Sequence, residues 1–92
     1  VMDYKFIKKV LDQIVSETRI DYDNERVYVP FYFAHTQWLH LDSVLSSTPR
    51  INYLFSKHCE EVYGLDKQEI EYVREEYIKI IKDKYNQWIR NF

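Results

Sequence analysis

The chain has 92 residues, a formal net charge of -2 and a hydrophobic fraction of 46%. These values fit one globular domain with a core, and the near-balanced charge argues against a dominant electrostatic interaction with nucleic acid or an anionic membrane. A single cysteine excludes an internal disulfide, and Lys8 and Lys9 interrupt the apolar run near the N-terminus, so we expect a cytoplasmic protein without a membrane span.

The first predicted element is a helix over residues 3–17. Asp3 is a suitable N-cap residue, and one Gly and two Pro in the whole chain favour long helices over a many-stranded sheet. Apolar residues then recur at helical spacing and form one face: Phe6, Ile7, Val10, Leu11, Ile14 and Val15.

A β-hairpin over 18–33 follows, because the apolar period changes from 3.6 to 2. A two-residue Asp23-Asn24 loop places Asp21 opposite Arg26, which is a stabilising pair across strands. The second strand is predicted to place Val27, Val29, Phe31 and Phe33 on one face and Tyr28, Pro30 and Tyr32 on the other. Pro30 cannot donate to a ladder, so the strand is an edge or ends there. The helices are expected to cover the valine face.

Three more helices are predicted over 36–46, 49–63 and 66–91. The first is expected to begin at Thr36 and to turn three residues inward: Trp38, Leu41 and Leu45. The fold class is therefore α+β and mostly α, with the helices packed over the hairpin and a long last helix.

The ends of the last two helices carry clear local signals. Thr48 as N-cap with Pro49 at the first helical position begins the helix over 49–63, and Gly64 ends it as a left-handed cap. The predicted apolar face of this helix comprises Ile51, Leu54, Phe55, His58, Cys59, Val62 and Tyr63. Asp66 and Glu69 form a capping box at the start of the helix over 66–91.

No motif indicates a particular chemistry. The single glycine leaves no phosphate-binding loop, and Cys59 lies on an apolar helical stripe, where a thiol behaves as a small hydrophobe. The possible metal ligands lack the paired spacing of a zinc site: His35, His40, His58 and Cys59. We therefore expect no metal, no cofactor and no enzymatic activity.

Residues 56–73 have the helix–glycine–helix layout of a DNA-binding helix-turn-helix. Glu60 stands where that motif needs a small residue, and residues 60–76 contain seven acidic and two basic side chains, which repels phosphate. A plain helical hairpin is the preferred interpretation. A nucleic-acid-binding regulator remains the alternative function, through basic surfaces of the first and last helices: Lys5, Lys8, Lys9, Lys79, Lys82, Lys84 and Arg90.

Four tyrosines lie outside the predicted core pattern and are candidates for protein binding: Tyr28, Tyr32, Tyr53 and Tyr72. Binding surfaces over-use tyrosine because it buries a large area with few rotatable bonds. The leading hypothesis is a small non-enzymatic protein-interaction module, such as a regulator, inhibitor or accessory subunit. Few Ala and Gly beside many Ile, Lys, Tyr and Asn indicate an AT-rich genome, such as that of a low-GC bacterium, a phage or a plasmid.

The last helix is also a candidate for self-association. It is expected to measure about 37 Å, whereas a compact domain of this size is about 30–32 Å across. Its final turn, which is expected to project, carries Trp88, Ile89 and Phe92, and Ile78 widens its apolar face. A two-fold dimer is the commonest way to bury such residues. The alternative is that this helix bends or that the helix over 36–46 covers it.

Overall fold

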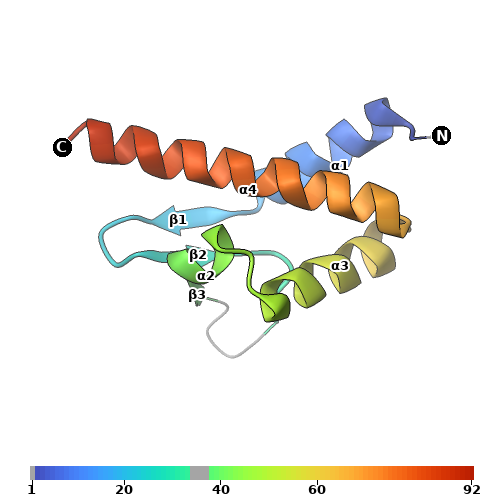
Figure 1. Cartoon of the computed structure of the whole chain (residues 1–92), viewed down its shortest axis with the longest axis horizontal. Coiled ribbons are helices and arrows are strands. Elements are labelled where there is room, and N and C mark those ends of the chain that lie inside the picture. The colour runs from blue at the N-terminus through green and yellow to red at the C-terminus, as the bar shows by residue number, and fades with distance from the viewer. Residues whose placement is uncertain (1, 34–37) are drawn as a thin grey trace.

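The computed structural model describes residues 2–33 and 38–92. The elements follow in the order α1 (Tyr4–Ser16), β1 (Arg19–Asp21), β2 (Arg26–Tyr28), β3 (Trp38–His40), α2 (Leu41–Leu45), α3 (Pro49–Tyr63) and α4 (Lys67–Arg90) (Figure 1). The three strands form one antiparallel sheet in the order β1-β2-β3. The predicted α+β class, mostly helical with a long last helix, is confirmed.

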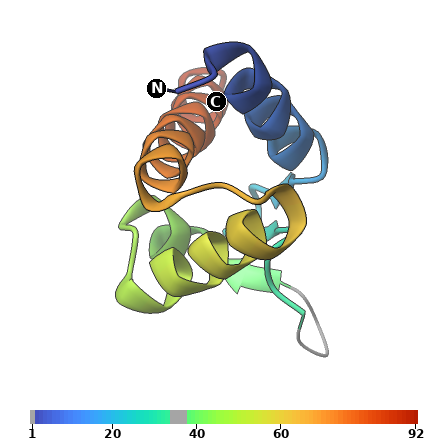
Figure 2. The same cartoon turned by 90° about the vertical axis from the view of Figure 1, so that its right-hand side faces the viewer.

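α4 is the element along which the others are arranged. It crosses α1 and also contacts α2 and α3 (Figure 1, Figure 2). The two termini lie at opposite ends of the long axis, and the molecule measures 43 × 29 × 20 Å along its principal axes. The protein is therefore elongated along α4, whose 24 residues span about 36 Å.

The core joins the three longer helices to the inner face of the sheet, and an aromatic group lies at its centre. Tyr77 is 1% exposed and its ring contacts Phe31 and Phe55, with centroids 5.9 and 5.4 Å away. Its hydroxyl lies 2.9 Å from the hydroxyl of Thr18, which itself donates to the carbonyl of Ile14 at 2.8 Å. Because Thr18 has only one hydroxyl proton, Tyr77 is the donor between them. The polar atom of this buried ring is thereby satisfied.

The predicted hairpin register is confirmed, with Asp21 paired to Arg26. The carboxylate of Asp21 accepts from Asn24 Nδ2 at 2.9 Å and from Arg26 Nε at 3.0 Å, and these bonds lower the pKa of Asp21. The ladder stops at Asp21 and Arg26, so the loop between the strands comprises residues 22–25 rather than two residues. Glu25 N donates to Tyr22 O at 3.2 Å and closes the predicted turn over Asp23 and Asn24. Within this loop, Glu25 adopts the left-handed conformation, with φ of 50°. A four-residue turn closed by one left-handed residue keeps the same register.

The prediction of a helix from residue 36 was wrong in part, because residues 38–40 form β3. This strand pairs Leu39 with Val27 and Trp38 with Tyr28, and α2 begins only at Leu41. β3 satisfies backbone groups of β2 that a helix would leave unpaired. An apolar period over so few residues does not separate a short strand from a helical turn. The predicted cap Thr36 lies outside the described residues.

The predicted inward face of the second strand was wrong at Phe33. Val29 and Phe31 are buried, but Phe33 is 81% exposed. β2 ends at Tyr28, before Pro30, as expected for a residue without a backbone N–H. Beyond that point the chain has no pleat, so alternation no longer decides where a side chain points.

The predicted caps of the three longer helices are confirmed. Asp3 and Thr48 accept hydrogen bonds from the N–H groups three residues on, at 3.2 and 3.4 Å. Gly64 has φ of 64°, the left-handed cap. In the capping box, Glu69 N donates to Asp66 Oδ1 and Asp66 N donates to Glu69 Oε1, both at 2.9 Å. Local side-chain chemistry therefore sets where the helices start and stop.

Replacing Asp66 with Ala is expected to lower the free energy of unfolding by about 0.5–2 kcal/mol, because an N-cap hydrogen bond is lost. Urea denaturation followed by circular dichroism measures this change. Asp12→Ala is the matched control, since Asp12 is an exposed carboxylate within α1 and caps no helix. Equal stability of the native and Asp66→Ala proteins would contradict a role for the capping box.

Candidate functional site

The sheet has an inner face that joins the core and an outer face that does not. Val27 is fully buried, and its cross-strand neighbours Ile20 and Leu39 pack against the core. Successive residues of a strand point to opposite faces. The outer face therefore carries Arg19, Asp21, Arg26, Tyr28, Trp38 and His40.

Contacts between side chains of neighbouring strands hold the outer face in a defined arrangement. Tyr28 and Trp38 pair across β2 and β3, and their rings meet edge to face with centroids 5.6 Å apart. The guanidinium of Arg26 lies 4.5 Å from the Trp38 ring centroid, a cation–π contact, while its Nε bonds to Asp21. One face of the Trp38 ring is thus covered by Arg26.

Two hollows adjoin between the sheet, the segment 29–33 and α3. One of about 650 Å³ includes Arg19, Tyr28 and Tyr63 in its lining. The other, of about 340 Å³, includes Tyr32 and Tyr53. Both hollows share three lining residues, which makes them neighbours: Phe33, His58 and Val62. We refer to these three residues, with Tyr28, Tyr32 and Tyr53, as the Phe33 surface.

Large apolar side chains stand exposed on the Phe33 surface. Phe33 is 81% exposed, Tyr53 62% and Val62 59%. Val62 was predicted to belong to the apolar face of its helix, but α3 buries only Ile51, Phe55 and Cys59. Scattered exposed apolar residues are normal, whereas a group around adjoining hollows is typical of a binding surface.

His58 lies between the two hollows. Its ring meets the ring of Tyr63 edge to face at 5.8 Å, and its Nε2 is buried without a hydrogen-bond partner among the described residues. Burial lowers the pKa of His58, and this effect exceeds the opposite influence of the carboxylates of Glu17 and Glu61. The ring is therefore neutral at pH 7 and adds apolar surface to both hollows.

The structure brings three of the four predicted tyrosines to one region. Tyr28 lines one hollow, while Tyr32 and Tyr53 line the other. Tyr32 also packs partly against the core, and Arg50 lies over its ring, 5.3 Å from the centroid, with Nη2 donating to the hydroxyl at 3.4 Å.

Tyr72 lies elsewhere. Its ring meets that of Tyr4 edge to face at 5.6 Å and packs partly against the core. The predicted exposed position opposite the core stripe of α4 was wrong. α1 packs on α4 (Figure 2), and Tyr4 at the start of α1 covers Tyr72.

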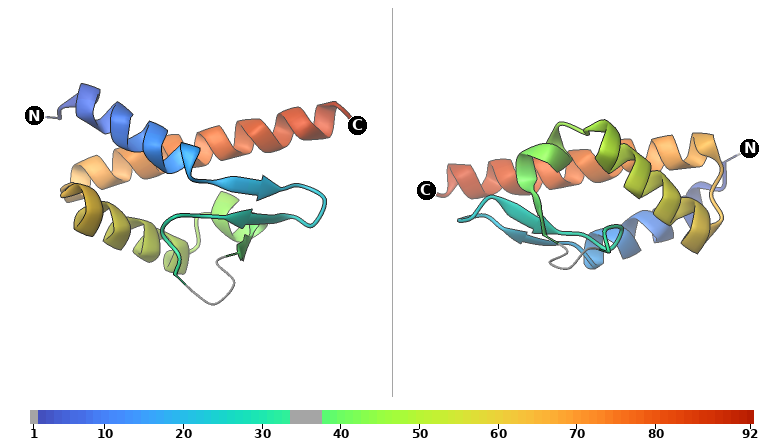
Figure 3. Two further views of the ribbon diagram at one scale, coloured as in Figure 1. Left: turned by 180° about the vertical axis from the view of Figure 1, so that it is seen from behind. Right: turned by 90° about the horizontal axis from the view of Figure 1, so that it is seen from below.

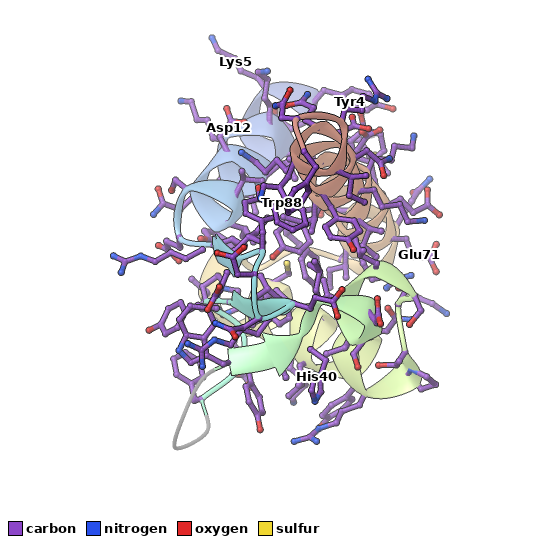
Figure 4. The ribbon with its side chains drawn as sticks, turned by 90° about the vertical axis from the view of Figure 1, so that its left-hand side faces the viewer. Tyr4, Lys5, Asp12, His40, Glu71 and Trp88 are labelled. Atoms are coloured by element: carbon purple, nitrogen blue, oxygen red, sulfur yellow. The ribbon has the colours of Figure 1, made fainter. Side chains whose placement is uncertain are left out.

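The residues predicted for self-association lie at the end of α4. Trp88 is half-buried and stacks on Tyr22 of the hairpin loop, with centroids 5.3 Å apart and planes at 14°. Figure 4 looks onto the C-terminal end of α4 and shows Trp88 between this helix and the hairpin, whereas Lys5 and Asp12 of α1 project outward. Ile89 is 46% exposed and Phe92 87%. The hairpin loop therefore reaches the end of α4 and covers Trp88, and Ile89 and Phe92 remain exposed.

The basic residues of the alternative function are exposed but divided. Lys5, Lys8 and Lys9 belong to the first half of α1, whereas Lys79, Lys82, Lys84 and Arg90 belong to the second half of α4. The N- and C-termini lie at opposite ends of the long axis (Figure 1). Lys79 is also paired with Glu76, with N and O atoms 3.7 Å apart. They do not form one continuous basic surface.

Among residues 2–33 and 38–92, no three His, Cys, Asp or Glu side chains converge as metal ligands, and His35 lies outside this part. No helix in the described chain is both long and apolar enough to cross a bilayer. Comparison with protein families, with curated proteins and with solved structures finds no match to this chain, so the proposals below rest on its own geometry.

Proposed function

We propose that this protein is a small non-enzymatic interaction module that binds another protein through the Phe33 surface. The observation that supports this is the gathering of three exposed apolar side chains, Phe33, Tyr53 and Val62, around two adjoining hollows. Protein interfaces concentrate their binding energy in a few large residues that fill or frame such hollows.

The residue types around the hollows support a partner with apolar anchors. The charges at the rim are mixed: Glu17 and Arg19 have opposite signs, and Lys57 pairs with Glu61 at 3.5 Å. A surface without a dominant charge selects a partner by shape and apolar contact. The outer face of the sheet extends this region with Tyr, Trp and Arg, the residues most enriched at binding hot spots.

A nucleic-acid-binding regulator is less well supported. Single-stranded nucleic acid needs a basic groove beside the aromatics on which its bases stack, and the charges at the rim of the Phe33 surface are mixed. Duplex nucleic acid needs a continuous basic surface, and the lysines are divided between the first half of α1 and the second half of α4. A regulator, inhibitor or accessory subunit of a protein complex is the role we propose instead.

The test begins with capture of the partner. A photo-crosslinking residue in place of Tyr53 marks proteins that reach the Phe33 surface in the source cell, and mass spectrometry identifies them. Calorimetry with the purified partner then compares the native chain with Phe33→Ser and Val62→Ser. Each variant is expected to weaken binding by at least about tenfold, or roughly 1.4 kcal/mol. Circular dichroism is expected to show an unchanged fold, since both side chains are exposed.

Phe6→Ser is the matched control, because Phe6 is an exposed phenylalanine (42%) on α1. It is expected to bind the partner like the native chain. Equal affinity of all four proteins would overturn the assignment of this surface. Nanomolar binding of DNA or RNA with a steep salt dependence would overturn the function itself.

A further inference from the structure

Two hollows adjoin along α4. The first, of about 530 Å³, lies between α3 and the start of α4, and the second, of about 420 Å³, lies between the end of α2 and the middle of α4. Arg74 lines both hollows, which makes them neighbours. In the right-hand view of Figure 3, α2 and the start of α3 lie toward one side of α4 and α1 toward the other. We refer to both hollows together as the α4 groove, with Glu60 and Glu71 at its first end, Arg74 at its middle and Lys82 at its second end.

The charge of the α4 groove changes sign along its length. Apart from the shared Arg74, three carboxylates and one lysine line the first hollow, whereas two lysines and one carboxylate line the second. The first end is therefore acidic and the second end basic. The first set is Glu60, Asp66, Glu71 and Lys67, and the second set is Lys79, Lys82 and Glu75.

The helix dipole does not account for this change of sign. The dipole favours acidic residues in the first turn and basic residues in the last, and its effect falls off within these turns. α4 runs from Lys67 to Arg90, so Glu71 lies just beyond the first turn and Lys82 two turns before the end. Glu71 and Lys82 are eleven residues apart, which places them on the same side of α4, roughly 16 Å from each other along its axis. Figure 4 shows Glu71 on the side of α4 that faces away from α1.

Several of these charges have no partner of opposite charge in the described part of the chain. Lys79 pairs with Glu76, with N and O atoms 3.7 Å apart, but Glu60, Glu71 and Lys82 form no ion pair with any described residue. Arg74 is half-buried, and its guanidinium forms neither an ion pair nor a hydrogen bond with residues 2–33 and 38–92. A guanidinium has five N–H donors in a fixed fork that matches a carboxylate. The donors of Arg74 are therefore available to an acidic ligand.

Apolar side chains line each hollow between the charges. Leu65 and Ile70 line the first hollow and are only 4% and 6% exposed. Leu45 and Ile78 line the second and pack partly against the core. A ligand in the groove therefore meets apolar surface along its length and a charge of opposite sign at each end, which is the usual composition of a binding site.

We propose that the α4 groove binds an extended peptide segment of another protein, with a basic side chain at Glu60 and Glu71 and an acidic side chain at Arg74 and Lys82. At about 3.3 Å per residue, an extended chain covers 16 Å in roughly five residues, so the two charged side chains stand about four to six residues apart. Opposite charges at the two ends fix the position of the segment and disfavour ligands of one sign, including nucleic acid. The groove shares no residue with the Phe33 surface, so the inference does not depend on the proposed function.

Selection from a displayed library of random linear peptides tests the proposal. Peptides are retained when they bind the native chain but not the Lys82→Glu variant, a selection that requires only an acidic residue in the peptide. The retained peptides are expected to carry a basic residue as well, about four to six positions from the acidic one. A selection that retains no peptide, or only peptides without this basic residue, overturns the proposal.

Calorimetry with a synthetic copy of a retained peptide then examines the acidic end. Glu71→Lys is expected to weaken binding about fivefold or more, because repulsion replaces attraction. Changing the basic residue of the peptide to Glu is expected to restore the affinity for this variant, as a double-mutant cycle requires. Failure of this rescue overturns the assignment of the acidic end.

Asp12→Lys is the matched control, because Asp12 is an exposed carboxylate of α1 and undergoes the same change of charge. It is expected to bind the peptide like the native chain, and so is Phe33→Ser. Equal weakening by Asp12→Lys and Glu71→Lys would show a general effect of net charge and overturn the proposal. Loss of binding in Phe33→Ser would place the peptide on the Phe33 surface and overturn it as well.

Discussion

Replacing Tyr77 with Ala is expected to lower the free energy of unfolding by about 3–5 kcal/mol, the usual cost of deleting a buried aromatic ring. Tyr77 is 1% exposed and joins Phe31 and Phe55 at the centre of the core. A domain of this length has a total stability of roughly 5–14 kcal/mol. The substitution therefore removes a large share of the total, and denaturation in urea followed by circular dichroism measures it.

Tyr77→Phe separates packing from hydrogen bonding at the same position. It keeps the ring but removes the hydroxyl that bonds to Thr18 at 2.9 Å, so the expected loss is only about 0.5–1.5 kcal/mol. Tyr53→Ala, at a tyrosine that is 62% exposed, is expected to change stability by less than about 0.5 kcal/mol. Similar losses at positions 53 and 77 would contradict the placement of Tyr77 in the core.

Cys59 is expected to react with a thiol reagent at least about a thousandfold more slowly in the native protein than in urea, because only the thiolate is nucleophilic. The side chain is 0% exposed, and burial raises the pKa of Cys59 from 9.0 to about 12. That shift alone reduces the thiolate about a thousandfold near pH 8, and steric exclusion adds to it. A disulfide reagent releases a chromophore as it reacts with the thiol, and the absorbance of this chromophore at pH 8 measures both rates.

The matched control is Tyr53→Cys, which places a second thiol on the exposed side of the same helix. The introduced thiol is expected to react quickly, whereas the thiol of Cys59 reacts only when the protein opens. The slow rate then reports the free energy of that opening. Two fast thiols in the folded variant would show that α3 does not shield Cys59.

Features that depend on neighbouring residues were predictable from the sequence. The capping box of Asp66 and Glu69 and the left-handed Gly64 satisfy backbone groups within a few residues of themselves. The pairing of Asp21 with Arg26 follows from the hairpin register, which opposite charges and apolar alternation both favour. The general arrangement of helices on a hairpin followed from these elements.

Features that depend on distant parts of the chain were not predictable. β3 forms because it pairs with the edge of β2 that β1 leaves unpaired. The sequence pattern of residues 38–40 does not indicate this pairing. Tyr72 is covered because α1 crosses α4 at that point, an angle that no single-helix pattern contains.

The residues of the candidate site also divide into those that the sequence predicted and those that it did not. Tyr28 and Tyr53 could be selected from the sequence because each stands apart from its apolar stripe, and the structure brings both to the Phe33 surface. Phe33, His58 and Val62, the residues shared by the two hollows, were assigned to apolar faces instead. The direction of Phe33 depends on the path of the chain after Pro30, where the pleat has ended, so alternation gave the wrong direction for this side chain.

The contacts of α4 also determine the order in which the molecule is assembled during synthesis. The hydroxyls of Thr18 and Tyr77, which meet in the core, are 59 residues apart in the chain, and Tyr22 of the hairpin finds its stacking partner only at Trp88. α1 and the hairpin are translated before α4, the helix on which they pack. The N-terminal half therefore cannot fully bury its apolar faces until α4 has left the ribosome. Until then these faces remain accessible to chaperones.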